Sequence, residues 1–154
     1  MRNTVACLVA LLAAGTAAAQ PKADPKADVL ATINQFVNSF NKGDMKTAVA
    51  TCASPAAVID EFPPHAWQGA NACGDWAKDF ASNAKAGGIT EPVVKIVKVN
   101  SNTVTGDRAY AVTTSSYDWK EKGKPMKESA SKFTFALQKT AAGWRITGWA
   151  WTME

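Results

Sequence analysis

The chain has 154 residues, a length typical of one domain, and a formal net charge of +4. Its lysines are scattered except for a cluster at Lys120, Lys122, Lys124 and Lys127, which has no interleaved aromatic residues and no nucleic-acid motif around it. We therefore expect no nucleic-acid partner, and we interpret the cluster as a solvated hairpin.

The first stretch, MRNTVACLVALLAAGTAAAQ, has the features of a secretory signal peptide. A single Arg2 precedes a short apolar run, and three alanines lie just before Gln20. The run is too short for a membrane span, which takes about 20 residues. We predict a signal peptide over residues 1–19, and an exported protein, periplasmic or secreted, that has no membrane attachment after cleavage.

Residues 20–28, QPKADPKAD, are rich in proline and charge, which predicts a flexible leader before a domain of residues 29–154. A helix is predicted next, because apolar residues recur at helical spacing. Its stripe is Val29, Leu30, Ile33, Phe36, Val37 and Phe40. Asp24 or Asp28 can cap this helix, and Gly43 ends it.

The middle of the chain predicts two more helices with a strand between them. Asp44 caps a short helix that Pro55 closes, and AAVIDEF (56–62) is a β-branched strand that ends at the two prolines 63–64. The third helix has Cys73, Trp76 and Phe80 in register, and a glycine pair stops it.

Two cysteines remain after signal cleavage, Cys52 and Cys73, near the end of the second helix and the start of the third. An even pair in an exported protein favours a structural disulfide over two free buried thiols. One histidine cannot complete a zinc site with two distant cysteines, so we expect no metal and no cofactor.

After the glycine pair the sequence turns to strand signals. We expect strands over 93–99, 103–105, 109–119, 131–139 and 144–153, with a turn at 101–102. Helices followed by a long antiparallel meander predict an α+β fold, with the helices on one face of a curved sheet. The mouth of such a cone is a natural ligand pocket.

The stretch FVNSFNKGDMKTAVATCASPAAVIDE (36–61) resembles the opening of nuclear-transport-factor-2-like proteins. WQG before the third helix and GWRITGW in the last strand are similar to the SnoaL-like and DUF4440-like branch. The resemblance covers about residues 29–153. It implies a cone-shaped antiparallel sheet wrapped around a long N-terminal helix, often dimeric, with an apolar pocket. It does not imply one activity, because this fold hosts isomerases, cyclases, dehydratases and non-catalytic domains.

Ketosteroid isomerases of this shape use an aspartate base and an oxyanion hole made of a tyrosine and a protonated aspartate. By resemblance, the base falls on Asp60, but the two donors fall on Phe36 and Ser131. Each lost donor typically costs about 10²–10³ in rate. Steroid isomerisation is therefore not expected, and whether the protein is an enzyme at all stays open.

Asp60 and His65 are the candidate catalytic residues. The resemblance places the Asp60 carboxylate inward, where burial would raise its pKa toward that of a useful base; the alternative is a turn acid that binds nearby amides. His65 follows a rigid proline pair, and could polarise a substrate, pair with Asp60, or simply pack at the rim.

The remaining candidates are aromatic or hydroxyl side chains for binding a small apolar ligand: Phe36, Phe40, Trp67, Trp76, Phe80, Tyr117, Ser131 and Phe133. Tyr110 and Tyr117 have opposite parity, so one of them faces inward. In the last strand, Trp149 and Trp151 oppose Trp144 in parity. Both faces would then be apolar, which predicts a homodimer.

Three interpretations of function follow. The first is an exported pocket protein of the SnoaL-like type for an apolar or aromatic ligand. The second is a non-catalytic dimerisation or interaction module. The third is an isomerase or dehydratase with Asp60 as general base, which would need a donor such as Tyr117 or His65 in the same cavity.

Overall fold

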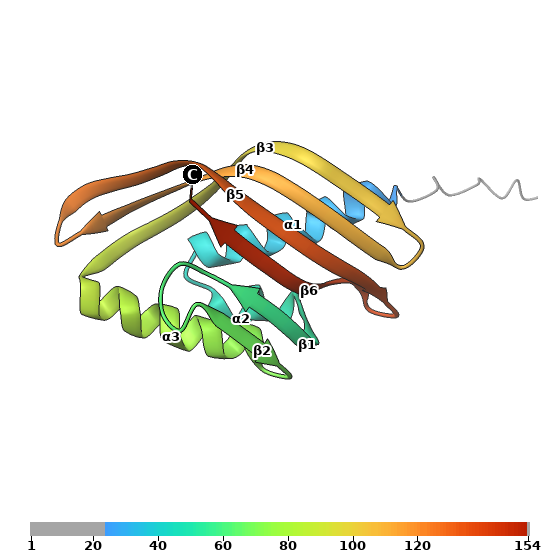
Figure 1. Ribbon diagram of the computed structural model, residues 1–154, viewed down its shortest axis with the longest axis horizontal. Helices are drawn as coiled ribbons and strands as arrows, with labels where there is room; N and C mark the ends of the chain where they lie inside the picture. The colour runs from blue at the N-terminus through green and yellow to red at the C-terminus, as the bar shows by residue number, and fades with distance from the viewer. Residues whose placement is uncertain (1–23, 154) are drawn as a thin grey trace, which may run out of the picture.

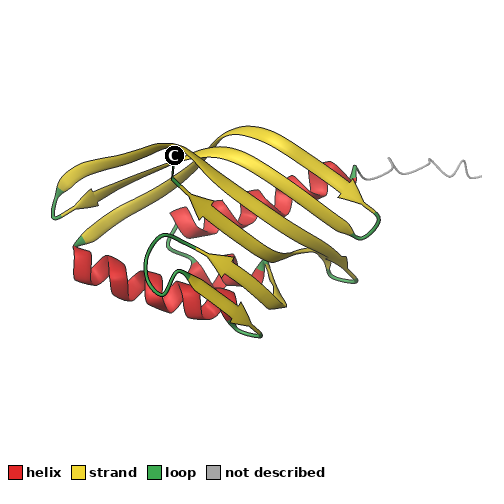
Figure 2. Ribbon diagram, in the orientation of Figure 1, coloured by secondary structure: helices red, strands yellow, loops and turns green. Residues whose placement is uncertain are grey.

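The computed structural model describes residues 24–153, which form a layer of helices against one curved sheet (Figures 1 and 2). In chain order the elements are α1 (Pro25–Asn41), α2 (Met45–Ala50), β1 (Cys52–Ile59), β2 (Ala66–Gly69), α3 (Ala72–Gly87), β3 (Ile89–Thr105), β4 (Arg108–Glu121), β5 (Lys124–Thr140) and β6 (Gly143–Thr152). The predicted signal peptide lies outside the described residues.

The six strands make an open sheet in the order β2-β1-β6-β5-β4-β3. Neighbouring strands are antiparallel except β1 and β6, which pair in parallel. The sequence predicts a wholly antiparallel sheet, so this one pair differs from the prediction. The sheet arches over α1, and α3 lies along the open side of the arch (Figure 1). The α+β class and the curved sheet around a long first helix are as predicted.

Helix α1 begins four residues earlier than the expected domain start. Asp24 caps it by accepting a hydrogen bond from the backbone N–H of Lys26 at 2.9 Å, and Pro25 occupies the first turn. Residues 25–28 are therefore helical, which corrects the flexible leader over that range. The predicted apolar stripe is the buried face of the helix, and Val29 and Ile33 are fully buried.

The chain around Pro55 differs from the prediction. Helix α2 ends at Ala50, and Pro55 lies inside β1 instead of closing the helix. The strand tolerates it because the β1–β6 register shifts between Cys52 and Ala57, where the missing N–H of proline is not needed. A further difference is that β3 runs unbroken through the turn expected at residues 101–102, with irregular pairing just before it.

A disulfide joins Cys52, the first residue of β1, to Cys73 in the first turn of α3, with Cα atoms 6.6 Å apart. The predicted pairing is confirmed. The bond links α3 to the side of the sheet formed by the short strands β1 and β2. It therefore fixes the position of the helix that carries Trp76 and Phe80.

An irregularity in β6 removes the two apolar faces from which the sequence predicts a dimer. Ala136 pairs with Gly148 and Leu137 with Ile146, so Thr147 is an extra residue that reverses the parity of the strand. Trp144, Trp149 and Trp151 are consequently all buried, at 3%, 5% and 8% exposure. The last strand therefore does not have two apolar faces, and it gives no support for a homodimer.

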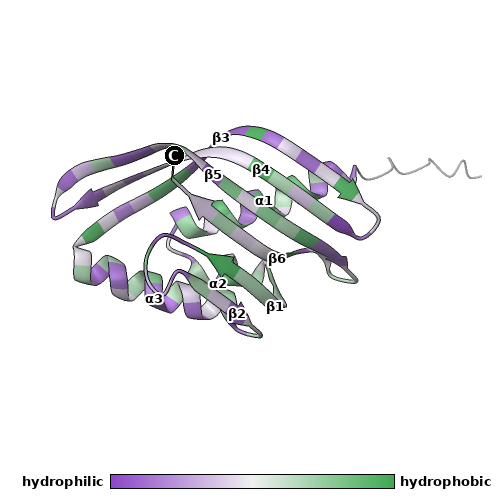
Figure 3. Ribbon diagram, in the orientation of Figure 1, coloured by the Kyte–Doolittle hydropathy of each residue, from purple (hydrophilic) through white to green (hydrophobic). Residues whose placement is uncertain are grey.

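The lysine cluster lies on the β4–β5 hairpin, where Figure 3 shows hydrophilic residues at the tip. Lys122, Lys124 and Lys127 are exposed, and Lys120 forms an ion pair with Glu91 at 2.7 Å. The interpretation as a solvated hairpin matches this placement. Between residues 24 and 153, none of the helices combines the length and the apolar character that crossing a membrane requires.

Candidate ligand pocket

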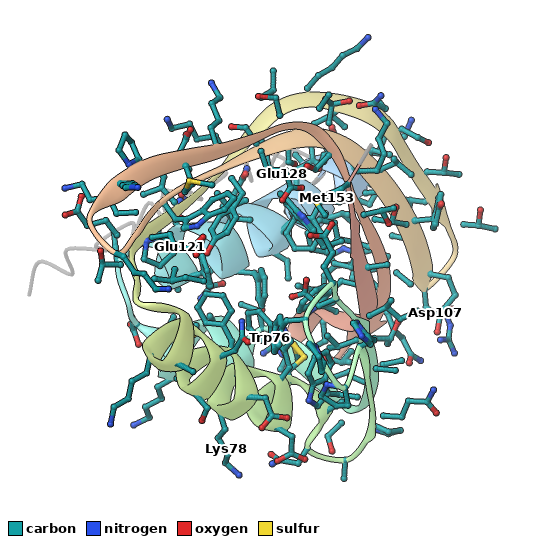
Figure 4. The ribbon with its side chains drawn as sticks, turned by 60° about the vertical axis from the view of Figure 1, so that its left-hand side comes forward. Trp76, Lys78, Asp107, Glu121, Glu128 and Met153 are labelled. Carbon is teal, nitrogen blue, oxygen red and sulfur yellow. A yellow bond between two sulfur atoms is a disulfide. The ribbon has the colours of Figure 1, made fainter. Side chains whose placement is uncertain are left out.

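A cavity of about 280 Å³ lies between α1, α3 and the concave face of the sheet. Ten aromatic side chains line it: Phe36, Phe40, Phe62, Trp76, Phe80, Tyr117, Trp119, Phe133, Trp149 and Trp151. Among the lining residues in the described range, only Asn83 and Met153 are exposed, and we expect the mouth of the cavity beside them. In Figure 4, Trp76 points from α3 into this space, whereas Lys78 on the same helix points outward.

The rings pack on one another at the base of the cavity. Trp149 is in edge-to-face contact with Trp76, with ring centroids 4.8 Å apart, and with Phe133 at 5.4 Å. Near the other wall, Tyr117 stacks on Trp119 at 4.7 Å. Mutual contacts of this kind hold the ring orientations, so the walls are preformed.

Asp60 follows directly after β1 and lines the cavity as a half-buried residue. Its Oδ2 accepts a hydrogen bond from Trp76 Nε1 at 2.8 Å, and its Oδ1 accepts one from the backbone N–H of Glu61 at 2.8 Å. Burial raises the pKa of this carboxyl group, these two hydrogen bonds oppose the rise, and the nearby charge of Glu128 adds to it. Asp60 thus combines features of a buried base with those of a turn acid.

His65 lies outside the cavity and its side chain is exposed. Its backbone carbonyl accepts a hydrogen bond from the N–H of Asp60 at 3.0 Å, and its Nδ1 is 3.3 Å from the Asp60 carbonyl oxygen. These contacts shape the turn after β1 through backbone atoms. Between residues 24 and 153 no hydrogen bond or ion pair joins the imidazole to the Asp60 carboxylate, although the charge of His65 also opposes the rise in the Asp60 pKa. A pairing of the two side chains stays a prediction.

Two further carboxylates line the cavity, and neither was among the site residues predicted from the sequence. Glu61 accepts a hydrogen bond from the backbone N–H of Met153 at 2.7 Å. Burial raises the pKa of Glu61, and the charge of Glu128 raises it further. Glu128 accepts hydrogen bonds from Ser131 Oγ and, at 2.8 Å, from Trp151 Nε1.

A β-bulge brings Glu128 inward. Ser115 pairs with Ser131 and Tyr117 with Glu128, so a step of two residues on β4 is matched by a step of three on β5. Ala130, within this bulge, has a φ of 63°. Strict alternation from Ser131 would have placed Glu128 on the outer face, and this is why strand parity alone could not predict it.

Several donors at the cavity carry no partner. Within residues 24–153, Tyr117 Oη, Trp119 Nε1 and Trp149 Nε1 are buried and make no hydrogen bond. Burial raises the pKa of Tyr117, with Asp60 and Glu128 adding to the rise, so its hydroxyl is protonated and can donate. Unsatisfied buried donors are uncommon, and each is able to bind an acceptor atom of a ligand or a water molecule.

Of the eight side chains expected to bind ligand, six line the cavity: Phe36, Phe40, Trp76, Phe80, Tyr117 and Phe133. The other two do not. Trp67 is buried nearby, where its Nε1 donates to Asp79 Oδ2 at 2.8 Å, and Ser131 lies behind the wall as the donor to Glu128. Trp119 shares the face of Tyr117, so parity could have predicted it. Parity in the last strand assigns Trp149 and Trp151 to a dimer interface instead.

Comparison with solved structures shows the same fold in proteins of low sequence identity. A nuclear transport factor 2-like superfamily protein from Salmonella enterica superposes with a TM-score of 0.71 at 16% identity, covering 84% of this chain and 90% of its own. A ketosteroid isomerase-like protein from Erwinia carotovora gives 0.65 at 18%, covering 84% and 96%. An NTF2-like protein with a cystatin-like fold from Novosphingobium aromaticivorans gives 0.67 at 16%, covering 84% and 81%.

The fold is therefore that of the nuclear-transport-factor-2-like proteins, and the site is an aromatic pocket inside its cone. The chain belongs to the family of SnoaL-like domains, whose sequence pattern it matches over residues 29–150. Among curated proteins, no sequence matches it. Within the described range 24–153, no group of three or more histidine, cysteine or acidic side chains is placed to hold a metal ion.

Proposed function

We propose that the chain is an exported small-molecule-binding protein whose pocket takes a ligand with an apolar or aromatic body. The observation that carries this proposal is the cavity of about 280 Å³, with aromatic walls and the unpartnered donors of Tyr117 and Trp149. Apolar walls with a few polar groups are the usual form of a ligand site. The Cys52–Cys73 disulfide supports an oxidising compartment.

The test uses a neutral aromatic probe, 1-aminoanthracene, whose emission rises in an apolar site. Asn83 is an exposed residue at the mouth, so Asn83→Trp should obstruct entry without disturbing the core. Ser82→Trp is the matched control, because Ser82 is exposed on the same helix and does not line the cavity. We expect the wild type and Ser82→Trp to bind the probe and Asn83→Trp to bind it much more weakly. Equal emission from all three proteins, or none from the wild type, would count against the pocket.

A second candidate function is acid–base catalysis as an isomerase or dehydratase. It is favoured by one observation: Asp60, with its raised pKa, and the unpartnered hydroxyl of Tyr117 line the same cavity. In such a reaction Asp60 would abstract a proton and Tyr117 would donate to the oxygen that gains charge. Phe36, which has no hydroxyl, and Ser131, which is bonded to Glu128, still argue against a steroid substrate.

A catalytic role predicts that Asp60→Asn abolishes turnover but leaves binding of the 1-aminoanthracene probe intact. Tyr117→Phe should lower turnover by about 10²–10³ for a lost oxyanion donor. If a substrate is found and both variants turn it over at the wild-type rate, the catalytic proposal is excluded.

A homodimer remains a proposal with different support. β3 and β4 carry exposed apolar side chains, among them Val97 at 67% and Tyr110 at 51% exposure, which a second subunit would cover. Sedimentation velocity across micromolar concentrations decides this question. Tyr110→Lys should shift a dimer toward monomer, and a wild type that sediments as a monomer throughout would rule the dimer out.

A further inference from the structure

The pocket carries negative charge without a balancing positive one. Asp60, Glu61 and Glu128 line it, and no lysine or arginine of residues 24–153 does. In the same range the salt bridges lie elsewhere, as in the pair Lys95–Asp118, and none involves these three acids. The carboxylates also act on one another, because the charge of Glu128 raises the pKa of both Asp60 and Glu61.

Within the described residues, the hydrogen bonds to these carboxylates all come from neutral donors. The indole N–H groups of Trp76 and Trp151, the hydroxyl of Ser131 and two backbone N–H groups supply the hydrogen bonds. Such donors stabilise a carboxylate but do not neutralise it, and clustered like charges in a partly buried site destabilise each other. A cation bound among these carboxylates would supply the charge that the neutral donors do not.

The aromatic walls of the pocket also favour a cation, in addition to the three carboxylates. Trp149 meets Trp76 and Phe133 nearly at right angles, with interplanar angles of 90° and 81°, so ring faces and edges alternate around one corner. The face of an aromatic ring is negative, so a cation over an indole face is attracted to it, and more strongly once both are desolvated. Aromatic walls with carboxylates nearby are the usual surroundings of a bound ammonium group.

We propose that the ligand of this pocket is an organic cation, an amine or quaternary ammonium group on an apolar or aromatic body. This inference rests on the proposed binding function and specifies its ligand class. The ammonium group lies against the carboxylates of Asp60, Glu61 and Glu128 and the neighbouring indole faces. The unpartnered Tyr117 hydroxyl and the Trp149 N–H bind an acceptor atom of the same ligand.

The selectivity is local to the cavity. The whole chain has a formal net charge of +4, so its long-range field does not attract cations. Added salt screens exposed charges but acts weakly inside a partly buried site. Cation preference should therefore persist at high ionic strength, which separates pocket binding from attraction to surface acids.

The test compares three probes of nearly equal size by isothermal titration calorimetry. Benzyltrimethylammonium is the cation, neopentylbenzene replaces its nitrogen with carbon, and 3-phenylpropionate is the anion. We expect the cation to bind at least about tenfold more tightly than the neutral isostere. The anion should bind more weakly than both.

Glu128→Gln keeps the shape of the side chain and its ability to pair with Ser131 and Trp151, but removes one charge. It should weaken cation binding about tenfold and leave the neutral probe unchanged. Asp107→Asn is the control, since it removes one negative charge in the same shape-conserving way from an exposed residue that does not line the cavity. Figure 4 shows Asp107 at the edge of the molecule, well away from Glu128 and Trp76. We expect this variant to bind like the wild type.

The outcomes separate this inference from the binding function itself. If the neutral isostere binds as tightly as the cation, or if Asp107→Asn weakens the cation as much as Glu128→Gln, the cation proposal is wrong and the pocket remains. If none of the three probes nor 1-aminoanthracene binds the folded wild type, both proposals fail.

Discussion

The hydrogen bond between Trp76 Nε1 and Asp60 Oδ2 can be tested by replacing Trp76 with phenylalanine. Trp76→Phe removes the donor and leaves a half-buried carboxylate that keeps only its bond from the Glu61 N–H. A hydrogen bond to a charged group contributes about 1.5–3 kcal/mol to stability. Because Asp60 is not fully buried, we expect the lower half of that range for the bond itself.

The chain offers a matched control in Trp149. Trp149→Phe removes the same atoms from a buried indole, 5% exposed, whose Nε1 has no partner in residues 24–153. Both variants lose packing, but only Trp76→Phe loses a hydrogen bond. In urea unfolding at pH 7, Trp76→Phe should therefore be less stable than Trp149→Phe by about 1.5 kcal/mol.

The pH dependence gives a second readout. Burial has already raised the folded-state pKa of Asp60 above 3.8, so the folded protein binds more protons between the two pKa values, and stability falls as pH rises through that window. Losing the Trp76 donor raises the folded-state pKa further. The extra cost of Trp76→Phe should thus be full at neutral pH and shrink as Asp60 protonates on acidification.

NMR titration of the Asp60 carboxyl carbon measures this directly, and an Asp60→Asn background should remove the difference between the two variants. Equal stabilities for Trp76→Phe and Trp149→Phe at pH 7, or an Asp60 pKa that does not rise in Trp76→Phe, would refute the argument.

Three other predictions concern the disulfide, the last strand and the N-terminus. Replacing both Cys52 and Cys73 with alanine removes a covalent link between residues 21 positions apart, and should lower the free energy of unfolding in urea by about 3 kcal/mol. An unchanged unfolding midpoint would contradict that value. Trp149→Glu places an unpaired charge in the core and should prevent folding, which circular dichroism would detect. A variant that folds but assembles differently from the wild type would instead support a dimer through β6. Mass spectrometry of the protein from its native compartment should find Gln20 as the first residue, and a mature chain that keeps Arg2 would argue against export.

Local patterns predicted the elements that depend on local physics. The 3.6-residue stripe of α1 and a cap at Asp24 or Asp28 are set within a few residues of sequence. Alternation along β4 likewise predicts that one of Tyr110 and Tyr117 faces inward, and in the structure it is Tyr117. The resemblance placed Asp60 at the end of its strand. For these features, neighbouring residues or a familiar topology carry enough information.

The errors about which strand residues face the cavity came from pairings between distant segments. The extra residues in β5 and β6 exist because of the partner strands, and nothing local marks Thr147 or Ala130 as a bulge. Each bulge reverses which side chains face the helices. Alternation alone therefore misplaces the tryptophans of β6, and Glu128 lies in the part of β5 that precedes the strand predicted over 131–139.

The bulge in β5 also decides which charged side chain of this strand faces the cavity. Without it, regular alternation from Ser131 would turn Ser129 and Lys127 inward, a hydroxyl and a base, and Glu128 outward. With it, Glu128 is the residue that pairs with Tyr117 and lines the cavity. Glu128 and Ser131 are three residues apart, so both can lie on the same face of the sheet only because of the bulge. A related sequence of the same length that pairs regularly here would exchange an acidic chamber for one carrying its own counter-ion. The presence or absence of the bulge therefore decides whether this segment gives the cavity an acid or a base.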